Sequence, residues 1–315
     1  MDIRYGPELL EEVVTRELLR REEAGDRAAS DAFRRESDLL YLVPGRAAQD
    51  SAFERLHASY FRKLGFAAPV ERAASGFPSF RGVIEEIRVD RTRSGGEEEA
   101  DLMVDAVSGR KAVRIRIRTE RMADPAALEG FLRQELRHIA DMLRPEFGYR
   151  PPGRLAERPV EENLVRARLR LVWNLVVAGT LARRGLAGAA TRKEWERLAA
   201  RLYPALAPAA ADRIVATLWE AEETAYPDLV RFATRPEDLL AFAGLERGAV
   251  DGPAAGTSCP LCGFPTFDWT ADWSRISAPA VGAIAADFPG WTKERGACRQ
   301  CSDVYSIRAA CSVPA

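Results

Sequence analysis

Four of the five cysteines in this 315-residue chain stand in two C-x-x-C pairs near its end. Cys259 and Cys262 lie in CPLCGFP, and Cys298 and Cys301 lie in GACRQCSDVY. Each short pair directs two sulfurs towards one point, and four thiolates are the usual ligands of a structural zinc ion. The spacing therefore predicts a Zn²⁺ site. The alternative is a set of buried or redox-active cysteines without metal, and Cys311 is expected to be a free buried thiol.

The segment that carries these pairs, residues 257–315, resembles a zinc ribbon. The resemblance implies a structural ion and a binding surface for a protein or nucleic-acid partner, and it implies no reaction. Aromatic side chains between the two pairs are expected to form a small core around the metal: Phe264, Phe267, Trp269, Trp273, Phe288 and Trp291.

A second group of side chains of the types found in catalytic sites begins with the sequence QELRH (residues 134–138) and extends to Asp141. On a helix with 100° per residue, Gln134, His138 and Asp141 share one face, and Glu135 lies at its flank. His57 is the other histidine of the chain, and it also follows a glutamate three positions earlier. If His57 lies across from His138, these two histidines and a carboxylate from Asp141 or Glu135 would bind a second metal ion, and Glu135, if it is not a ligand, would be the general base.

This helix and the strands predicted before it, residues 79–145, resemble the core of zincin-type metallopeptidases, whose active-site helix carries H-E-x-x-H. The resemblance implies that His138 is a metal ligand and Glu135 a general base. Gln134 stands where the first histidine of the motif belongs, and an amide oxygen is a poor zinc ligand. The leading hypothesis is a degenerate core that binds without turnover. One alternative is an active zinc metallopeptidase or hydrolase, and another is a helix without metal whose Glu135–His138 pair is an ordinary helical interaction.

The chain is predicted to be an α+β protein, mostly helical, with a small antiparallel sheet before the QELRH helix. Alternating apolar residues predict strands within 80–92, 99–107 and 111–120. Helical periodicity, capping residues and prolines predict helices near residues 7–23, 27–41, 50–65, 125–143, 160–184, 191–203, 208–224 and 226–243.

Three parts are expected along the chain. Residues 1–150 contain a helical segment, the sheet and the zincin-like helix, residues 151–247 form a helical domain, and residues 257–315 form the zinc ribbon. The segment 245–258 is rich in glycine, alanine and proline and is the expected boundary before the ribbon.

Arg114, Arg116 and Arg118 occupy one face of the last predicted strand. They would either contact phosphates or pair with acidic side chains across the sheet, and pairing is the favoured hypothesis. The expected partners are Glu85, Glu86, Asp101 and Asp105.

Composition limits the remaining functions. A net charge of −1 gives no overall field that would attract nucleic acid or an anionic membrane. The longest apolar run, 171–182, is too short to span a bilayer, and the first residues do not resemble a secretion signal, so we expect a cytoplasmic protein without a membrane partner. The chain has no glycine-rich phosphate loop, so no nucleotide or dinucleotide cofactor is expected.

Overall fold

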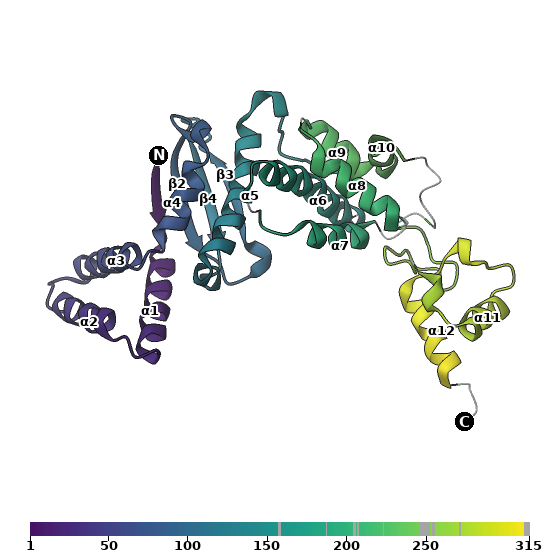
Figure 1. Ribbon diagram of the computed structural model, residues 1–315, viewed down its shortest axis with the longest axis horizontal. Coiled ribbons are helices and arrows are strands. Elements are labelled where there is room, and N and C mark those ends of the chain that lie inside the picture. The colour runs from purple at the N-terminus through teal and green to yellow at the C-terminus, as the bar shows by residue number, and fades with distance from the viewer. Residues whose placement is uncertain are drawn as a thin grey trace. The chain divides into compact units, whose positions relative to one another are not determined.

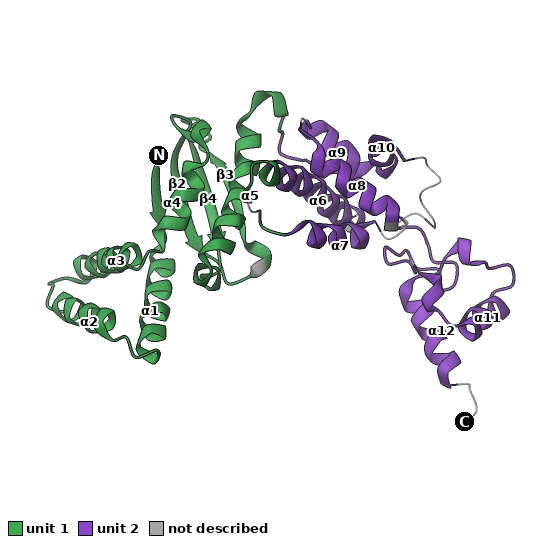
Figure 2. Cartoon of the chain, in the orientation of Figure 1, with its two compact units in different colours: residues 1–149, 181–190 green, residues 150–180, 191–315 purple. Residues whose placement is uncertain are grey.

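The computed structural model divides the chain into two compact units (Figure 2). Unit 1 comprises residues 1–149 and 181–190, and unit 2 comprises residues 150–180 and 191–315. Both contribute to a mostly helical α+β protein, as the sequence predicts. The residues that the structure describes are 1–156, 159–186, 188–203, 206, 208–222, 224–245, 253, 256–270 and 272–311.

Unit 1 is built on a four-stranded mixed sheet (Figure 1). Its strands, in the spatial order β1-β2-β4-β3, are β1 (Asp2–Tyr5), β2 (Ile84–Arg91), β4 (Lys111–Ile117) and β3 (Glu99–Val104). β2 runs parallel to both β1 and β4, whereas β3 runs antiparallel to β4 through a hairpin. The three predicted strands are confirmed.

The predicted antiparallel order of the sheet is wrong, because β2 is parallel to its two neighbours and β1 is an additional strand. Alternation of apolar residues indicates which side chains face the core, but it does not indicate the direction of the neighbouring strand. Parallel neighbours need a long crossover connection. Four helices provide it between β1 and β2: α1 (Pro7–Glu23), α2 (Ala28–Leu40), α3 (Arg46–Lys63) and α4 (Ala67–Ser75).

Two of these helices differ from the sequence-based expectation. α3 begins at Arg46, a turn before the predicted start at Asp50, because Gly45 with φ of 88° lets the chain enter the helix there. α4 is a short helix that the sequence did not indicate, and it buries Ala67, Val70, Ala73 and Ala74.

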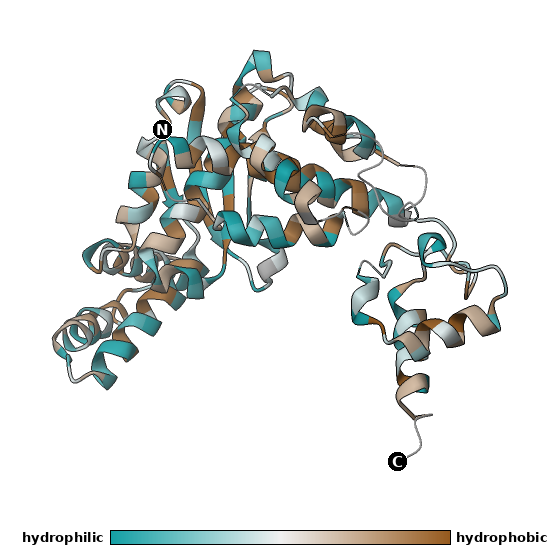
Figure 3. Cartoon of the chain, turned by 45° about the vertical axis from the view of Figure 1, so that its right-hand side comes forward, coloured by the Kyte–Doolittle hydropathy of each residue, from teal (hydrophilic) through white to brown (hydrophobic). Residues whose placement is uncertain are grey.

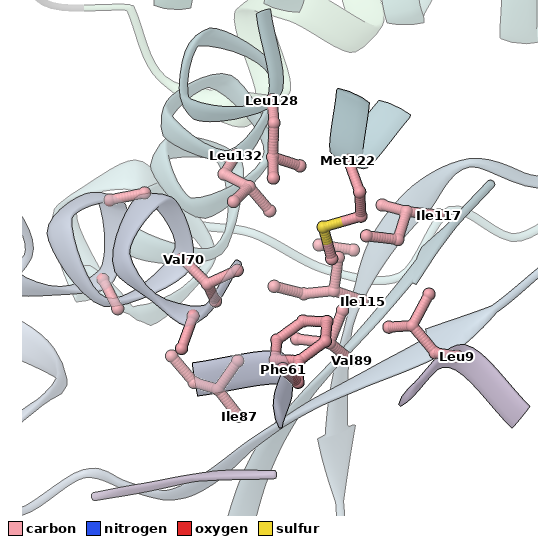
Figure 4. Close-up of a cluster of buried hydrophobic side chains, with 14 of the residues drawn as sticks. Leu9, Phe61, Val70, Ile87, Val89, Ile115, Ile117, Met122, Leu128 and Leu132 are labelled. Carbon is pink, nitrogen blue, oxygen red and sulfur yellow. The ribbon is translucent and has the colours of Figure 1, made fainter. Parts of the chain in front are cut away.

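The core of unit 1 lies where one face of the sheet meets the helices (Figure 4). Val113, Ile115 and Ile117 of β4 are completely buried, and Phe61 of α3 lies among the same side chains. Burying each such side chain stabilises the fold by about 1.5–3 kcal/mol. The apolar side of the predicted alternation on β4 is therefore confirmed as its core side.

α5 (Pro125–Leu143) carries the QELRH sequence and packs on this core through Leu128 and Leu132 (Figure 4). The Asp124 carboxylate accepts hydrogen bonds of 3.0 Å from the backbone N–H groups of Ala126 and Ala127. These bonds satisfy N–H groups that the helix itself leaves unpaired, so the predicted N-cap is confirmed.

Unit 2 contains five consecutive helices, α6 (Pro159–Arg183), α7 (Arg192–Leu202), α8 (Pro208–Glu220), α9 (Tyr226–Thr234) and α10 (Pro236–Phe242). The last turn of α6 belongs to unit 1. α6 and α8 approach so closely at Gly179 that a Cβ atom there would lie 1.9 Å from the Trp219 carbonyl oxygen. Only glycine fits at this position. In the predicted boundary 245–258, residues 246–252, 254 and 255 lie outside the described residues.

The rest of unit 2 is a small segment, residues 256–311, that we call the cysteine module. It contains α11 (Ala278–Asp287), which is largely hydrophobic (Figure 3), and α12 (Arg299–Cys311). Its β-structure among the described residues consists of two isolated antiparallel bridges, Ser258–Pro265 and Trp269–Cys298. The zinc-ribbon resemblance therefore holds for the cysteine pairs and their bridged turns, while two helices occupy much of the segment.

Candidate metal centre

The first cysteine pair lies in a tight turn at the start of the cysteine module. The Cys259 N–H donates to the Phe264 carbonyl at 2.9 Å, and the Gly263 N–H donates to the Cys259 carbonyl at 2.8 Å. Gly263 has a φ of 75°, a conformation that glycine adopts without steric cost. The turn buries Cys259 and leaves Cys262 exposed.

The second pair lies at the start of α12. Cys298 immediately precedes the helix, and its sulfur accepts a hydrogen bond from the Cys301 N–H at 3.4 Å, as an N-cap side chain does. The positive end of the helix dipole also favours a thiolate at this position. The Arg299 N–H donates to the Asp268 carbonyl at 2.8 Å, which fixes the helix start against the bridged segment.

The fold brings the four predicted ligands together. The Cys298 N–H donates to the Cys259 sulfur at 3.3 Å, and the sulfurs of Cys262 and Cys298 are 3.9 Å apart. All four sulfurs lie within 4.8 Å of one another, so they can bind a single metal ion. Within the described part of the chain, this is the one group of three or more histidine, cysteine or acidic side chains with such spacing.

The surroundings of the sulfurs differ. Burial opposes ionisation of Cys259, but the N–H groups of Cys298, Cys262 and Leu261 point at its sulfur and together lower the pKa to about 7. Burial raises the pKa of both Cys298 and Cys301. One sulfur is thus already favoured as a thiolate by the fold, while ionisation of the other two depends on a cation at the site.

A small core holds the two pairs in place. Trp269, Ile284 and Trp291 are buried together with Cys259 and Cys298. Because the Trp291 indole N–H donates to the carbonyl of Gly296 at 2.7 Å, the core also fixes the backbone just before the second pair.

The prediction that all six aromatic side chains build this core is wrong for two of them. Trp273 and Phe288 pack against the core, but Phe264 is 73% exposed and Phe267 is only half-buried outside the cluster.

An apolar surface flanks the sulfurs and was not predicted. Phe264, Val304 and Ile307 are 73%, 56% and 65% exposed, and we call these three side chains the apolar surface. A pocket of about 440 Å³ opens there, and its walls include Cys262, Cys301, Phe264, Pro265, Val304 and Tyr305. Val304 and Ile307 are three positions apart, which places them on the same side of α12. The sequence analysis did not predict a helix here, so the spacing of Val304 and Ile307 was not recognised as one face. Cys311, expected to be buried, is exposed.

The polar residues of α5 contact other parts of unit 1. Gln134 is 1% exposed, and its side-chain oxygen accepts the backbone N–H of Ala189 at 3.2 Å. The Glu135 carboxylate accepts the N–H of Ala100 in the edge strand β3 at 3.1 Å. The buried Asp141 forms an ion pair of 3.0 Å with Arg137. Gln134 and Glu135 therefore bind backbone N–H groups, and Asp141 binds an arginine.

The two histidines lie on different helices. His57 is half-buried on α3, where its Nδ1 lies 2.9 Å from the Phe53 carbonyl oxygen and its ring contacts Phe33. His138 is half-buried on α5. His57, His138 and Asp141 are all described, and the structure does not bring them together as a ligand group.

Arg114 and Arg116 on the outer face of β4, and Arg118 directly after its end, are each paired with an acid, which confirms the favoured hypothesis. The partners are Asp90 for Arg114 (2.9 Å), Glu99 and Asp101 (3.1 Å) for Arg116, and Glu98 for Arg118 (3.4 Å). Asp101 is among the predicted partners, whereas Glu85 and Glu86 pair with other arginines and the Asp105 carboxylate accepts hydrogen bonds from Ser108.

Comparisons of the chain with protein-family models, with curated proteins and with solved structures give no match. In the part of the chain that the structure describes, none of the helices has the length and apolar character needed to cross a bilayer.

Proposed function

We propose that this chain is a zinc-binding protein whose cysteine module binds a protein partner without catalytic turnover. The observation that carries the proposal is the convergence of four sulfurs beside the exposed apolar surface. A zinc–sulfur bond is about 2.3 Å long, so the sulfurs of a tetrahedral site lie about 3.8 Å apart. The separation of 3.9 Å between Cys262 and Cys298, and the upper limit of 4.8 Å for the set, support zinc.

The ligand set supports a structural role for the ion. Four thiolates fill a tetrahedral zinc site, whereas catalytic zinc keeps one position open for water or substrate. Bound at this place, the ion links the first turn to the start of α12. Because such an ion contributes directly to folding, it would hold Phe264 and Val304 in fixed positions beside the same pocket.

Charge favours a protein over a nucleic-acid partner. The acidic residues of the cysteine module are Asp268, Asp272, Asp287, Glu294 and Asp303, and the basic residues are Arg275, Lys293, Arg295, Arg299 and Arg308. The two sets cancel, and four thiolates with one divalent ion add a net negative charge. Nucleic-acid binding relies on an excess of Lys and Arg for the phosphates, and the arginines of β4 are already paired.

The contacts of α5 favour the non-catalytic hypothesis over a metallopeptidase. A general base must be able to reach a metal-bound water, and Glu135 accepts a hydrogen bond from β3 instead. This bond and the contacts of the buried Gln134 and Asp141 give three polar residues of α5 partners other than a metal ion.

Metal analysis and site-specific cross-linking test the proposal. We expect one zinc per chain, lost in a Cys259→Ser, Cys262→Ser variant. A photo-reactive phenylalanine analogue at position 264 should cross-link a discrete protein in extracts of the source cells, and Val304→Ser should abolish the product. The same analogue at Val107, which is 98% exposed in unit 1, is the control. Zinc-free protein, or identical products from both positions, would refute the proposal.

A further inference from the structure

We infer that the partner inserts one large apolar side chain into the pocket beside the metal centre and places a basic side chain next to it. This inference rests on the proposed function of the cysteine module and adds the chemistry of the partner segment.

The apolar half of the inference comes from the pocket. Its volume of about 440 Å³ is more than enough for one bulky aliphatic or aromatic side chain, and Phe264, Pro265, Val304 and Tyr305 form the apolar part of its wall. Phe264 and Val304 are largely exposed, so the insertion would remove their apolar atoms from water. Binding energy in protein interfaces concentrates at such anchors. Ile307 lies about 4.5 Å further along the axis of α12, so the partner segment continues past the anchor by a turn.

The basic half of the inference comes from the charges on α12, which contributes Gln300, Cys301, Val304 and Tyr305 to the pocket wall. Arg299 and Arg308 of α12 are paired with Asp268 at 3.1 Å and Asp287 at 2.7 Å. Asp303 is exposed and is not itself part of the pocket wall, but it directly precedes the wall residue Val304 and has no ion-pair partner among the described residues. It is therefore the uncompensated charge on this part of the helix.

The sulfurs add to this negative charge. Cys262 is exposed, and both Cys262 and Cys301 line the pocket. Four thiolates around one divalent ion carry a net charge of −2, part of which faces the pocket. A Lys or Arg beside the apolar anchor would be attracted by Asp303 and by the sulfurs, whereas an acidic side chain would be repelled.

Peptide display on the zinc-loaded full chain tests the inference. Random 12-residue peptides on phage are selected on the wild type, and enriched peptides are synthesised and titrated by fluorescence anisotropy. We expect Leu, Phe or Trp with Lys or Arg within three positions. Val304→Ser should weaken binding at least about fivefold, as for an anchor contact. Asp303→Asn should weaken it about two- to fivefold, as for an exposed charge pair. Val107→Ser should change nothing, and zinc content confirms that each variant is folded.

The outcomes separate the two proposals. Peptides that need Val304 but show no preference for basic residues, and bind Asp303→Asn as well as the wild type, would overturn the inference and leave the binding surface in place. Peptides that bind Val304→Ser unchanged, or no enrichment at all, would overturn both. Self-association that Val304→Ser abolishes would assign the surface to a second copy of the chain and would also overturn the inference.

Discussion

Two regions of this molecule, α5 and the cysteine module, contain side chains that commonly bind metal ions. In α5 these side chains bind other parts of the protein, whereas in the cysteine module they converge on one point. In α5, Gln134 and Glu135 accept backbone N–H groups from other segments. In the cysteine module, backbone N–H groups point at Cys259 and Cys298, and the sulfurs point at one another. A side chain of the right type becomes a ligand only if the fold directs it to a shared point. Spacing along the sequence does not guarantee this.

The largest expected effect is the loss of the metal. Cys259→Ser with Cys262→Ser should release the zinc and unfold the cysteine module, because a structural zinc contributes about 10–16 kcal/mol to folding. Elemental analysis and limited proteolysis measure this, with cleavage confined to residues 256–311. Cys311→Ser is the matched control, since Cys311 is exposed and outside the ligand group. If the double variant retained its zinc, the ion would be bound elsewhere, and the contrast between the cysteine module and α5 would be wrong.

The next effect concerns the position at which α5 departs from H-E-x-x-H. Gln134→Ala should lower the free energy of unfolding by about 1–3 kcal/mol, because the Ala189 N–H loses its acceptor. Gln134→His should be destabilising as well and should bind no second zinc. Urea denaturation and metal analysis give both results. The exposed Gln300→Ala, as a control, should stay within about 0.5 kcal/mol. A second zinc in Gln134→His would mean that only one ligand separates α5 from a metal site.

A smaller effect is expected at Glu135. Glu135→Gln keeps an oxygen for the Ala100 N–H but removes its charge, so the loss should be about 1 kcal/mol, the difference between charged and neutral hydrogen bonds. Glu135→Ala should cost more, because it removes the acceptor altogether. Thermal denaturation of both variants measures the difference. If the protein had a hydrolytic activity and Glu135→Gln abolished it, α5 would have a catalytic role and the non-catalytic proposal would be wrong.

The smallest effect should come from the apolar surface. Phe264→Ser and Val304→Ser replace exposed side chains, so the free energy of unfolding should change by no more than about 0.5 kcal/mol. Urea denaturation is again the measurement. If either variant destabilised the chain by several times this amount, its side chain would be part of the folded core and not a surface for a partner.

Local patterns explain what the sequence predicts correctly. The C-x-x-C pairs, the cap at Asp124 and the alternation in β4 depend on neighbours a few positions away, and all three are confirmed. The failures depend on distant partners. The direction of β2 is set by β1 and β4, and the role of Gln134 is set by Ala189, which is 55 positions further along the chain. No window of sequence around either element contains this information.

Gln134 and Ala189 also bear on how such a chain can be divided. The chain leaves unit 1 after residue 149, runs through most of α6 in unit 2, and returns to unit 1 for residues 181–190 before leaving again. A fragment that ends at residue 149 would lack Ala189 and with it the hydrogen bond from its N–H to the buried Gln134 side chain. Unit 1 is therefore not one uninterrupted stretch of the sequence. A gene fusion that kept it intact would have to carry α6 with it.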